Sequence, residues 1–361
     1  MSKARQLADN GAATPNRNMV INGAMNVAQR GTSSTGLGAS NGYFTLDRWK
    51  LEFDSTAGRL TMTQTADGPS GFLNCLKFAC TTADTSIAAG EIFTLQQRFE
   101  GQNLQRIKKG TSDAEKLSVS FYVKGNASAT YVCELRDQDN ERHVAKTFAV
   151  TTSWNRIELV FPADTSGAFG DDNARSLDLN IWLHAGSTYT GGTLASTWAS
   201  TTNGNRAAGI SSFFDATSRT FFITGVQMEV GEPTPFEHEP YGVTQAKCYR
   251  YAQRHPSVDS GENYNQIANG FAGSATETFH FCRHYETMRA EPSLTNNGSF
   301  RVRYRATATD VTSATTLSDA GSNMDNTFLV GTVGSTQTTG EGALLEQSND
   351  VDAHIILDAE L

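Results

Sequence analysis

Three aromatic residues near the middle of the chain have the chemistry to hold a sugar. Trp182 lies in an alternating segment, and Tyr189 and Trp198 lie in a stretch rich in Gly, Ser and Thr at residues 185–209. A flat ring can stack on the face of a pyranose while neighbouring polar groups bind its hydroxyls. These three residues are therefore the candidate carbohydrate contacts.

The strand pattern around Trp182 predicts where its ring points. Leu179, Ile181 and Leu183 share one parity and Trp182 has the other, so we expect Trp182 to face away from the core that the three aliphatic residues define. A second interpretation competes with glycan contact. Aromatic residues are also enriched in interfaces, so Trp182, Tyr189 and Trp198 could instead close over the sandwich edge or meet a neighbouring subunit.

The acidic residues lie at positions where turn chemistry explains them. Asp137, Asp139 and Glu141 fall in one polar turn, and Asp171 and Asp172 fall in another. Catalysis would need two carboxylates facing a cleft, or a nucleophile with its base. The first cluster also lacks the Gly and the final Glu of a calcium-binding EF-hand loop. The sequence predicts no enzyme, no cofactor and no metal.

Histidine and cysteine residues give no metal pattern within one chain. His280 and His284 share a strand face with Cys282, but side chains four residues apart on a strand are about 13 Å apart, too far to share an ion. We interpret them as surface histidines; the alternative is one histidine from each of three chains meeting on a three-fold axis. The cysteines are odd in number and lack a Cys-x-x-Cys pair, which predicts free, buried thiols at Cys75, Cys80, Cys133, Cys248 and Cys282.

Several charged residues stand between apolar or aromatic neighbours. They are Arg30, Arg48, Arg98, Glu100 and Glu229. A buried charge without a partner costs several kcal/mol, so such side chains are retained when they are paired. We therefore expect an arginine–carboxylate pair that joins the first strand to the last, with Arg30 or Arg48 bound to Glu229.

Short alternating segments must position these residues. The clearest is 221–231, where Phe222, Val226, Met228 and Val230 share one parity and are predicted to face the core. Similar segments recur from residue 17 onward, with turn signals between them and few helical patterns. This spacing favours an antiparallel β-sandwich.

The chain is long enough for two domains. We expect an N-terminal attachment segment at 1–16, a β-sandwich at 17–242, a short helical hinge at 243–252 and a smaller β-domain at 253–361. The attachment segment carries little apolar periodicity and would order only against a partner. The last domain has a thin core, which suggests that neighbouring chains bury its apolar faces.

Charge and hydropathy argue against nucleic-acid binding, membrane insertion and export. The formal charge is −9, which disfavours binding to nucleic acid, because such affinity comes from Lys and Arg. The sequence has no run of 18 apolar residues, and residues 1–7 lack the apolar part of a secretory signal. We expect neither membrane insertion nor export.

Several short motifs follow one another in order along the chain: NGAM at 22–25, QRG at 29–31, DRW at 47–49, QRFEG at 97–101, SFYVK at 120–124, GVQMEVG at 225–231, PFE at 235–237, PYG at 240–242 and DAEL at 358–361. Together they resemble a family of bacteriophage virion proteins described as tail fibre or minor structural proteins. The resemblance covers about residues 17–252, with a further match at the end of the chain.

The resemblance implies a jelly-roll sandwich similar to carbohydrate-binding modules, displayed on a virus particle after synthesis in the host cytoplasm. It implies a non-enzymatic structural component, a homotrimeric tail fibre or fibre-like appendage for host attachment. Its N-terminal segment would dock onto other virion proteins. One alternative is a head fibre or decoration protein; another is a carbohydrate-binding module for host surface polysaccharide that uses Trp182, Tyr189 or Trp198. A depolymerase ranks last.

Overall fold

The computed structural model describes residues 16–257, 262–304, 307–310, 317–334 and 337–361. The expected attachment segment at 1–16 therefore lies outside the described residues, apart from Asn16. The chain divides into two compact units: the first ends at Tyr241, and the second spans Gly242–Glu360.

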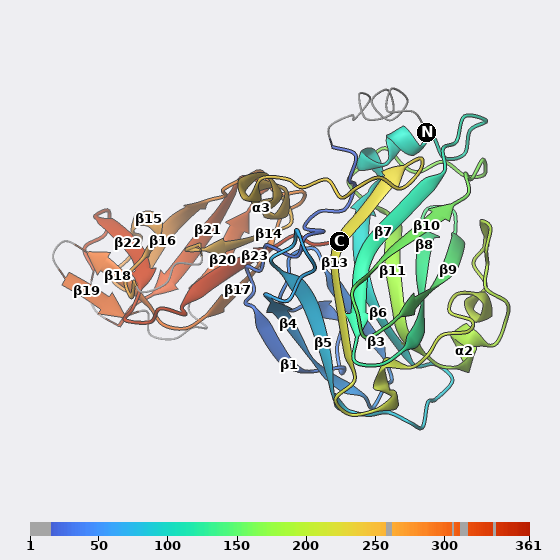
Figure 1. Cartoon of the computed structure of the whole chain (residues 1–361). Helices are drawn as coiled ribbons and strands as arrows, with labels where there is room; N and C mark the ends of the chain where they lie inside the picture. The colour runs from blue at the N-terminus through green and yellow to red at the C-terminus, as the bar shows by residue number, and fades with distance from the viewer. Residues whose placement is uncertain (1–15, 258–261, 305–306, 311–316, 335–336) are drawn as a thin grey trace. The chain divides into compact units, whose positions relative to one another are not determined.

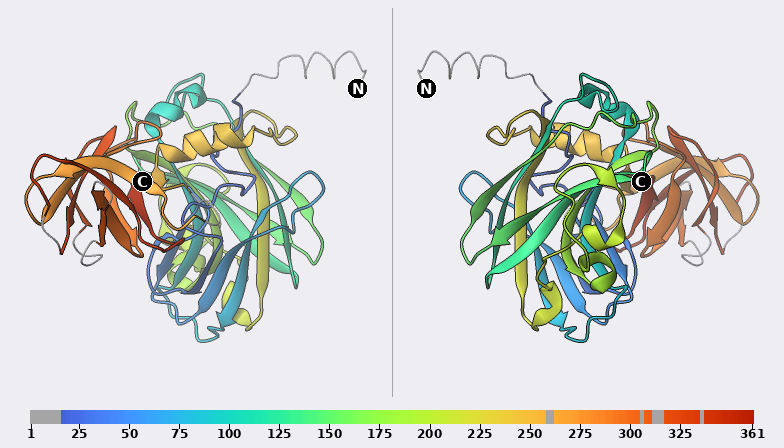
Figure 2. Two further views of the ribbon diagram at one scale, coloured as in Figure 1. Left: turned by 90° about the vertical axis from the view of Figure 1, so that its left-hand side faces the viewer. Right: turned by 90° about the vertical axis from the view of Figure 1, so that its right-hand side faces the viewer.

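The first unit is an antiparallel jelly-roll β-sandwich (Figures 1 and 2). Its six-stranded sheet has the order β1-β4-β5-β13-β7-β10, with the bounds Ser33–Leu37, Arg59–Thr65, Cys75–Thr82, Thr220–Val230, Leu117–Gly125 and Asn155–Phe161. Its seven-stranded sheet has the order β12-β9-β8-β11-β6-β3-β2, with the bounds Ala199–Ser200, Arg142–Val150, Ala129–Asp137, Arg175–Ala185, Ile92–Glu100, Lys50–Asp54 and Gly42–Tyr43. The predicted all-β fold class is confirmed.

The core of the sandwich lies between the two sheets. Val119 and Phe121 of β7 face it from one side, and Leu179 and Ile181 of β11 face it from the other; all four are fully buried. Burying one such side chain stabilises the fold by about 1.5–3 kcal/mol. The alternation that the sequence shows in these two strands therefore sets which face of each sheet is inside.

A bulge in β13 changes the predicted parity of that strand. The register with β7 shifts between Thr224 and Gln227, and Gly225 has a φ of 61°. Phe221 is buried before the bulge and Val226 after it. Phe222 was predicted to face the core, but its ring lies near Trp154, with the centroids 6.3 Å apart, and Phe222 is only partly buried. The extra residue of the bulge reverses the alternation.

Short helices connect these strands. The 3₁₀ turns are Gly101–Asn103, Gln105–Ile107, Asn203–Asn205 and Phe213–Asp215, and the α-helices are α2 (Ser187–Thr190) and α3 (Tyr241–Tyr249). Helix α3 overlaps the segment expected to be a hinge, and its hinge role stays a prediction. None of the helices in the described ranges has the length and apolar character needed to span a bilayer.

The ion pairs differ from those expected. Glu229 lies 3.8 Å from Arg17 Nε, so Arg17 and not Arg30 or Arg48 is its arginine partner. Arg30 Nη1 instead lies 3.9 Å from Asp47, and Arg48 donates to the carbonyl of Arg98 at 2.6 Å. The expected pair between the first strand and the last is therefore wrong: Arg17 precedes the first strand, β1, and its contact with Glu229 joins the coil before β1 to β13.

The second unit is the smaller β-domain. A three-stranded sheet has the order β14-β23-β17, with the bounds Ala252–His255, His354–Asp358 and Ser293–Asn297. A seven-stranded sheet has the order β19-β18-β22-β15-β16-β21-β20, with the bounds Thr307–Asp310, Phe300–Tyr304, Gly342–Gln347, Gln266–Ala272, Glu277–Arg283, Asn326–Thr332 and Leu317–Ser322. Its buried core includes Cys282, Leu329 and Leu345.

Strand β16 corrects the interpretation of the histidines. His280 and His284 are buried, and His280 Nε2 lies 2.9 Å from the hydroxyl of Thr278 in the same strand. These residues are therefore not surface histidines, and an inward His280 cannot meet its copies on an external three-fold axis. The cysteines behave as expected: Cys75, Cys80, Cys133, Cys248 and Cys282 are all free and buried.

Candidate functional site

A surface pocket of the first unit gathers three segments that are far apart in the sequence. Its volume is about 460 Å³, and we call it the Phe72 pocket. The segments are the turn before β1, the connection between β4 and β5, and the stretch that follows β13. The lining residues are Ala24, Asn26, Gly71, Phe72, Leu73, Asn74, His238 and Tyr241.

Asn22 shapes the first wall of the Phe72 pocket. Its side-chain oxygen accepts the backbone N–H groups of Asn26 at 2.9 Å and Val27 at 3.0 Å, which closes the turn. Gly23 lies so close to β13 that an added Cβ would stand 2.0 Å from the carbonyl oxygen of Val226. The NGAM motif is thus explained by one side chain that holds a turn and one glycine that allows close approach.

The aromatic floor of the pocket is the ring of Phe72, which packs against other rings around it. The ring of Phe72 lies 5.3 Å from Tyr122, 5.0 Å from Phe236 and 4.9 Å from His238, measured between centroids. A Cβ at Gly225 would stand 2.7 Å from Phe72 Cζ, so this packing requires glycine at the bulge. The motifs at 225–231 and 235–237 therefore meet at Phe72, and Tyr241 of the PYG motif lines the same pocket.

The polar side chains that line the pocket include Asn26, Asn74 and His238. Asn74 Nδ2 donates to Asn26 Oδ1 at 3.2 Å, and Gln64 Nε2 donates to the carbonyl of Met25 at 2.7 Å, which supports the turn. Among the described residues, no group bonds to Asn26 Nδ2 or Asn74 Oδ1. Asn26 Nδ2 is thus a donor and Asn74 Oδ1 an acceptor available to a ligand hydroxyl, and both residues line the pocket.

The rim of the Phe72 pocket is apolar. Leu73 is 73% exposed, and Tyr241 is also exposed. An exposed aliphatic side chain beside an aromatic floor can pack against the apolar face of a bound ligand. Sequence reasoning did not identify this site, because its lining residues carry no local motif for binding and come together only when the ends of the domain pack against each other.

Trp182 does not offer its ring to a ligand. Its parity is as predicted, since it faces away from the core of the sandwich, but it is only 1% exposed. The segment 186–210 covers it: Ala207 is buried against it and Tyr189 packs on it, with the two ring centroids 5.4 Å apart. Parity shows which face of a sheet a residue occupies, not what lies over that face. Trp182 is therefore corrected to a covered structural residue.

Glu134 holds that covering segment in place. Its carboxylate accepts bonds from Arg206 Nε at 2.8 Å and Nη2 at 3.0 Å, and from Trp182 Nε1 at 2.8 Å. Desolvation by burial raises the pKa of Glu134, but the Arg206 guanidinium and the hydrogen bonds more than offset it and hold the pKa well below its usual range. A buried carboxylate with this many donors is structural.

The remaining predicted aromatics are partly buried. Trp198 Nε1 donates to the carbonyl of Pro162 at 2.9 Å, and the ammonium of Lys109 lies 5.4 Å from its ring. Lys109 in turn binds Asp137 at 2.5 Å and Asp164 at 3.1 Å. Tyr189 packs on Trp182, as described above. The structure does not bring Tyr189 and Trp198 to the Phe72 pocket, and their role in glycan contact stays a prediction.

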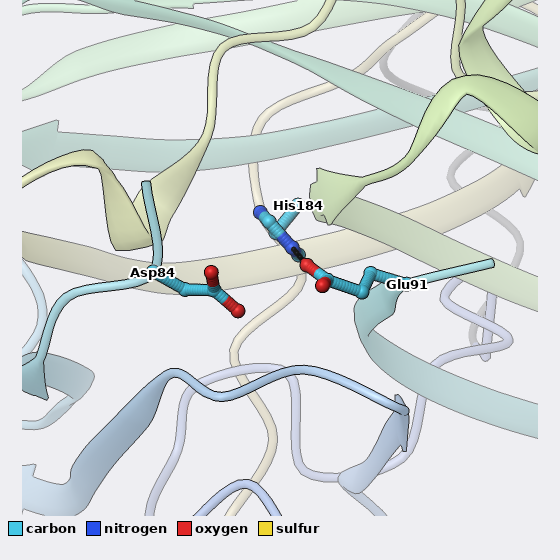
Figure 3. Close-up of side chains that lie close together, drawn as sticks. All are labelled: Asp84, Glu91 and His184. Carbon is cyan, nitrogen blue, oxygen red and sulfur yellow. Dashed lines mark hydrogen bonds and ion pairs between the residues drawn. The ribbon is translucent and has the colours of Figure 1, made fainter. Parts of the chain in front are cut away.

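A second cluster of polar side chains lies inside the first unit (Figure 3). Asp84, Glu91 and His184 are buried, and one ligand-type atom from each lies within 4.8 Å of the others. His184 Nε2 is 2.9 Å from Glu91, and His184 Nδ1 is 2.8 Å from the hydroxyl of Ser212. Oxygen and imidazole nitrogen atoms at such spacing can hold a metal ion. No local sequence pattern links these residues.

No protein-family model matches the chain, and no curated protein matches it. Similar solved structures include the enzymatically active domain of tailspike protein 4 of bacteriophage CBA120, at 13% identity and a TM-score of 0.32, over 60% of this chain and 22% of that one. They also include the family 11 carbohydrate-binding module of the Clostridium thermocellum cellulase Lic26A-Cel5E. It is 12% identical, with a TM-score of 0.28, over 57% of this chain and 98% of that one. A family 30 carbohydrate-binding module is 12% identical, with a TM-score of 0.30, over 62% of this chain and 94% of that one.

Proposed function

We propose that the first unit is a non-catalytic carbohydrate-binding β-sandwich that recognises a neutral polysaccharide through the Phe72 pocket. The observation that carries the proposal is the pair Asn26 and Asn74. Their mutual hydrogen bond fixes both amides and leaves one donor and one acceptor beside an aromatic floor. Fixed polar groups within a mainly apolar cavity give a site its specificity.

The composition of the pocket narrows the ligand. Its eight lining residues include no Asp, Glu, Lys or Arg, so nothing in it would attract a charged sugar. A glycosidase of the usual kind needs two carboxylates at the scissile bond, and this pocket has none. Its volume of about 460 Å³ lies within the usual range for small-ligand pockets. A short stretch or a branch of a neutral glycan fits these properties.

The test of this proposal is a binding screen on the whole chain. Neutral and acidic bacterial polysaccharides are compared on a glycan array, and hits are measured by isothermal titration calorimetry. We expect binding to neutral glycans, with no release of reducing ends on long incubation. Absence of binding to every neutral glycan, or steady release of reducing ends, would overturn the proposal.

A second function is favoured by a different observation, in the second unit. The outer face of its seven-stranded sheet carries Phe271, Phe279, Phe281 and Phe328, whose neighbouring ring centroids are 5.7, 5.5 and 5.0 Å apart. Phe281 is 57% exposed and Phe271 is 41% exposed. A continuous apolar surface of this kind marks a contact with another macromolecule. We call it the phenylalanine face.

A second copy of this chain is the occupant that the charges support. Strand β16 carries Glu277 at one end and Arg283 at the other, on the same face as Phe279 and Phe281. Two copies of the strand packed in opposite directions would place each Glu277 near the partner's Arg283 and the rings between them. The face is thus complementary to itself.

From this face we propose that two copies of the chain pair through antiparallel β16 strands. From the resemblance at the motifs we propose a structural component of a bacteriophage virion. The homotrimer that the resemblance implies would need a further, head-to-tail interface, because a two-fold contact alone closes as a dimer. Displayed on the particle and docked onto other virion proteins by residues 1–16, the chain would present the Phe72 pocket to host glycan. Light scattering on the purified chain should give the mass of an oligomer. An antibody raised against the chain should label intact phage particles produced by the virus that encodes it. A monomer at all concentrations would contradict the assembly, and unlabelled particles would contradict the location.

A further inference from the structure

We propose that Asp84, Glu91 and His184 form a binding site for one divalent cation, with Zn²⁺ as the metal that suits the ligands best. Figure 3 shows the three side chains directed toward one another. Asp84 and Glu91 belong to the connection between β5 and β6, and His184 comes from the end of β11. The ion would tie that connection to the seven-stranded sheet.

Charge is the first argument for a cation. The two carboxylates and the imidazole are all buried, with at most 5% of any residue exposed. Among the described residues, neither Asp84 nor Glu91 forms an ion pair with Lys or Arg; His184 is the charged-type partner of Glu91. Even with His184 protonated, the cluster keeps a net negative charge. Buried charge of this kind is stable when it is paired or when it coordinates a metal.

The neighbours of His184 give the second argument. Ser212 Oγ lies 2.8 Å from His184 Nδ1 and also accepts the backbone N–H of Phe214 at 3.0 Å. A hydroxyl oxygen has two lone pairs, so Ser212 can accept from Nδ1–H as well. Without a metal, Nε2–H can donate to Glu91; a bound metal ion would displace that proton and take up the Nε2 lone pair, while Nδ1–H donates to Ser212. A hydrogen bond from the second ring nitrogen is the usual arrangement for a metal-binding histidine.

The position of Asp84 is also fixed from outside the cluster. Its carboxylate accepts the backbone N–H of Ala57 at 2.7 Å and the hydroxyl of Thr56 at 3.0 Å. These bonds orient the carboxylate without neutralising it. One nitrogen and two carboxylate ligands leave the fourth position of a tetrahedral Zn²⁺ for a water molecule. The imidazole argues against Ca²⁺ and Mg²⁺, which prefer all-oxygen sites.

The experiment uses the whole chain after removal of metal by a chelator. Zn²⁺ is titrated by calorimetry, bound metal is counted by mass spectrometry, and thermal unfolding is followed with and without Zn²⁺. Cobalt(II) serves as a spectroscopic probe, since a tetrahedral site gives strong visible absorption. We expect one ion per chain, a higher melting temperature with Zn²⁺ and a tetrahedral cobalt spectrum.

Isosteric variants locate the site. Glu91→Gln and Asp84→Asn keep the shape of the side chains and remove one charge each, and we expect each to weaken Zn²⁺ binding by about tenfold or more. Asp215→Asn is the matched control, because Asp215 is an exposed carboxylate paired with Arg219; its Zn²⁺ affinity should equal that of the unaltered chain. The proposal is overturned if the unaltered chain binds no stoichiometric Zn²⁺, or if both isosteric variants bind it as tightly.

Discussion

Asn74 donates a hydrogen bond to the side chain of Asn26 across 3.2 Å, although the two residues are 48 positions apart. This bond joins the turn after the first motif to the strand that begins at Cys75. Both amides are thereby fixed at the edge of the Phe72 pocket, and each keeps one polar atom for a ligand. The proposed recognition of neutral glycan depends on this relationship.

The Glu134–Arg206 pair predicts a large loss of stability when its charge is removed. Glu134→Gln leaves the Arg206 guanidinium buried without its carboxylate, which should lower the free energy of unfolding by about 3–5 kcal/mol. Glu141→Gln is the matched control: Glu141 pairs with Arg136 at 3.0 Å, but its side chain is 66% exposed, so the cost should stay below about 1 kcal/mol. Denaturant unfolding measures both. Equal losses in the two variants would show that burial does not matter here.

The depressed pKa of Glu134 also predicts acid sensitivity. The folded state keeps the Glu134 carboxylate ionised far below its unfolded pKa of about 4.3. The stabilisation that ionised Glu134 gives the fold is therefore fully present above about pH 5, and it is lost as the pH falls toward the pKa of the folded state. Glu134→Gln should therefore flatten the acid limb of stability against pH. An unchanged slope in that variant would contradict the assignment.

Two buried histidines predict a separate pH dependence in the second unit. Burial lowers the pKa of His255 and of His280 from 6.5 to about 4, with the nearby His284 adding to the shift at His255. As the pH falls, these histidines are protonated in the unfolded chain before they are protonated in the folded one. The free energy of unfolding is therefore highest above about pH 6.5, and it falls by up to roughly 3 kcal/mol per histidine toward pH 4.

Hydrogen exchange on the strands of the second unit measures this loss. His280→Gln should reduce the pH dependence, since glutamine can still bond to Thr278 but does not titrate. His238→Gln is the control, because His238 lies exposed in the first unit. If His238→Gln had the larger effect on the second unit, the account of buried neutral histidines would be wrong.

The phenylalanine face predicts that one substitution weakens self-association. Phe281→Ser removes the most exposed ring of the face, and should shift the mass in sedimentation or light scattering toward that of a monomer. Val351→Ser changes another exposed apolar residue, outside the face, and should leave the mass unchanged. Both should fold, because exposed positions tolerate such changes within about 0.5 kcal/mol.

A charge exchange on β16 tests the direction of packing. Glu277→Lys places like charges opposite each other if β16 strands pack in opposite directions, and should weaken the oligomer. Adding Arg283→Glu restores opposite charges and should restore the mass. An oligomer unaffected by both Phe281→Ser and Glu277→Lys would show that another surface joins the chains.

Alternation predicted the inner faces of β7 and β11, because one side of each strand packs against the other sheet. It failed at Phe222, since a bulge is decided by the partner strand and by Gly225. It placed Trp182 on the correct face but could not show that Ala207 and Tyr189 cover it. Contacts that depend on a distant segment leave no local pattern.

The candidate site was still less accessible to sequence reasoning. The motifs at 22–25, 225–231 and 235–237 carry the resemblance, yet their common structural role depends on how they pack around the Phe72 pocket. Asp84, Glu91 and His184 are joined in the same way, since 93 positions separate Glu91 from His184. Long-range packing, not residue type, brings these groups together.

The central claim is tested most directly by measuring the affinity of Asn74→Ala for the best neutral glycan from the array. Asn74→Ala removes the acceptor at the pocket and releases Asn26, so we predict a loss of about 10–100-fold, as expected for one or two hydrogen bonds. Ile87→Ala, an exposed aliphatic residue outside the pocket, is the control and should bind as the unaltered chain does. Melting temperatures establish that both variants are folded. Equal affinity of Asn74→Ala and the unaltered chain would contradict glycan recognition at the Phe72 pocket.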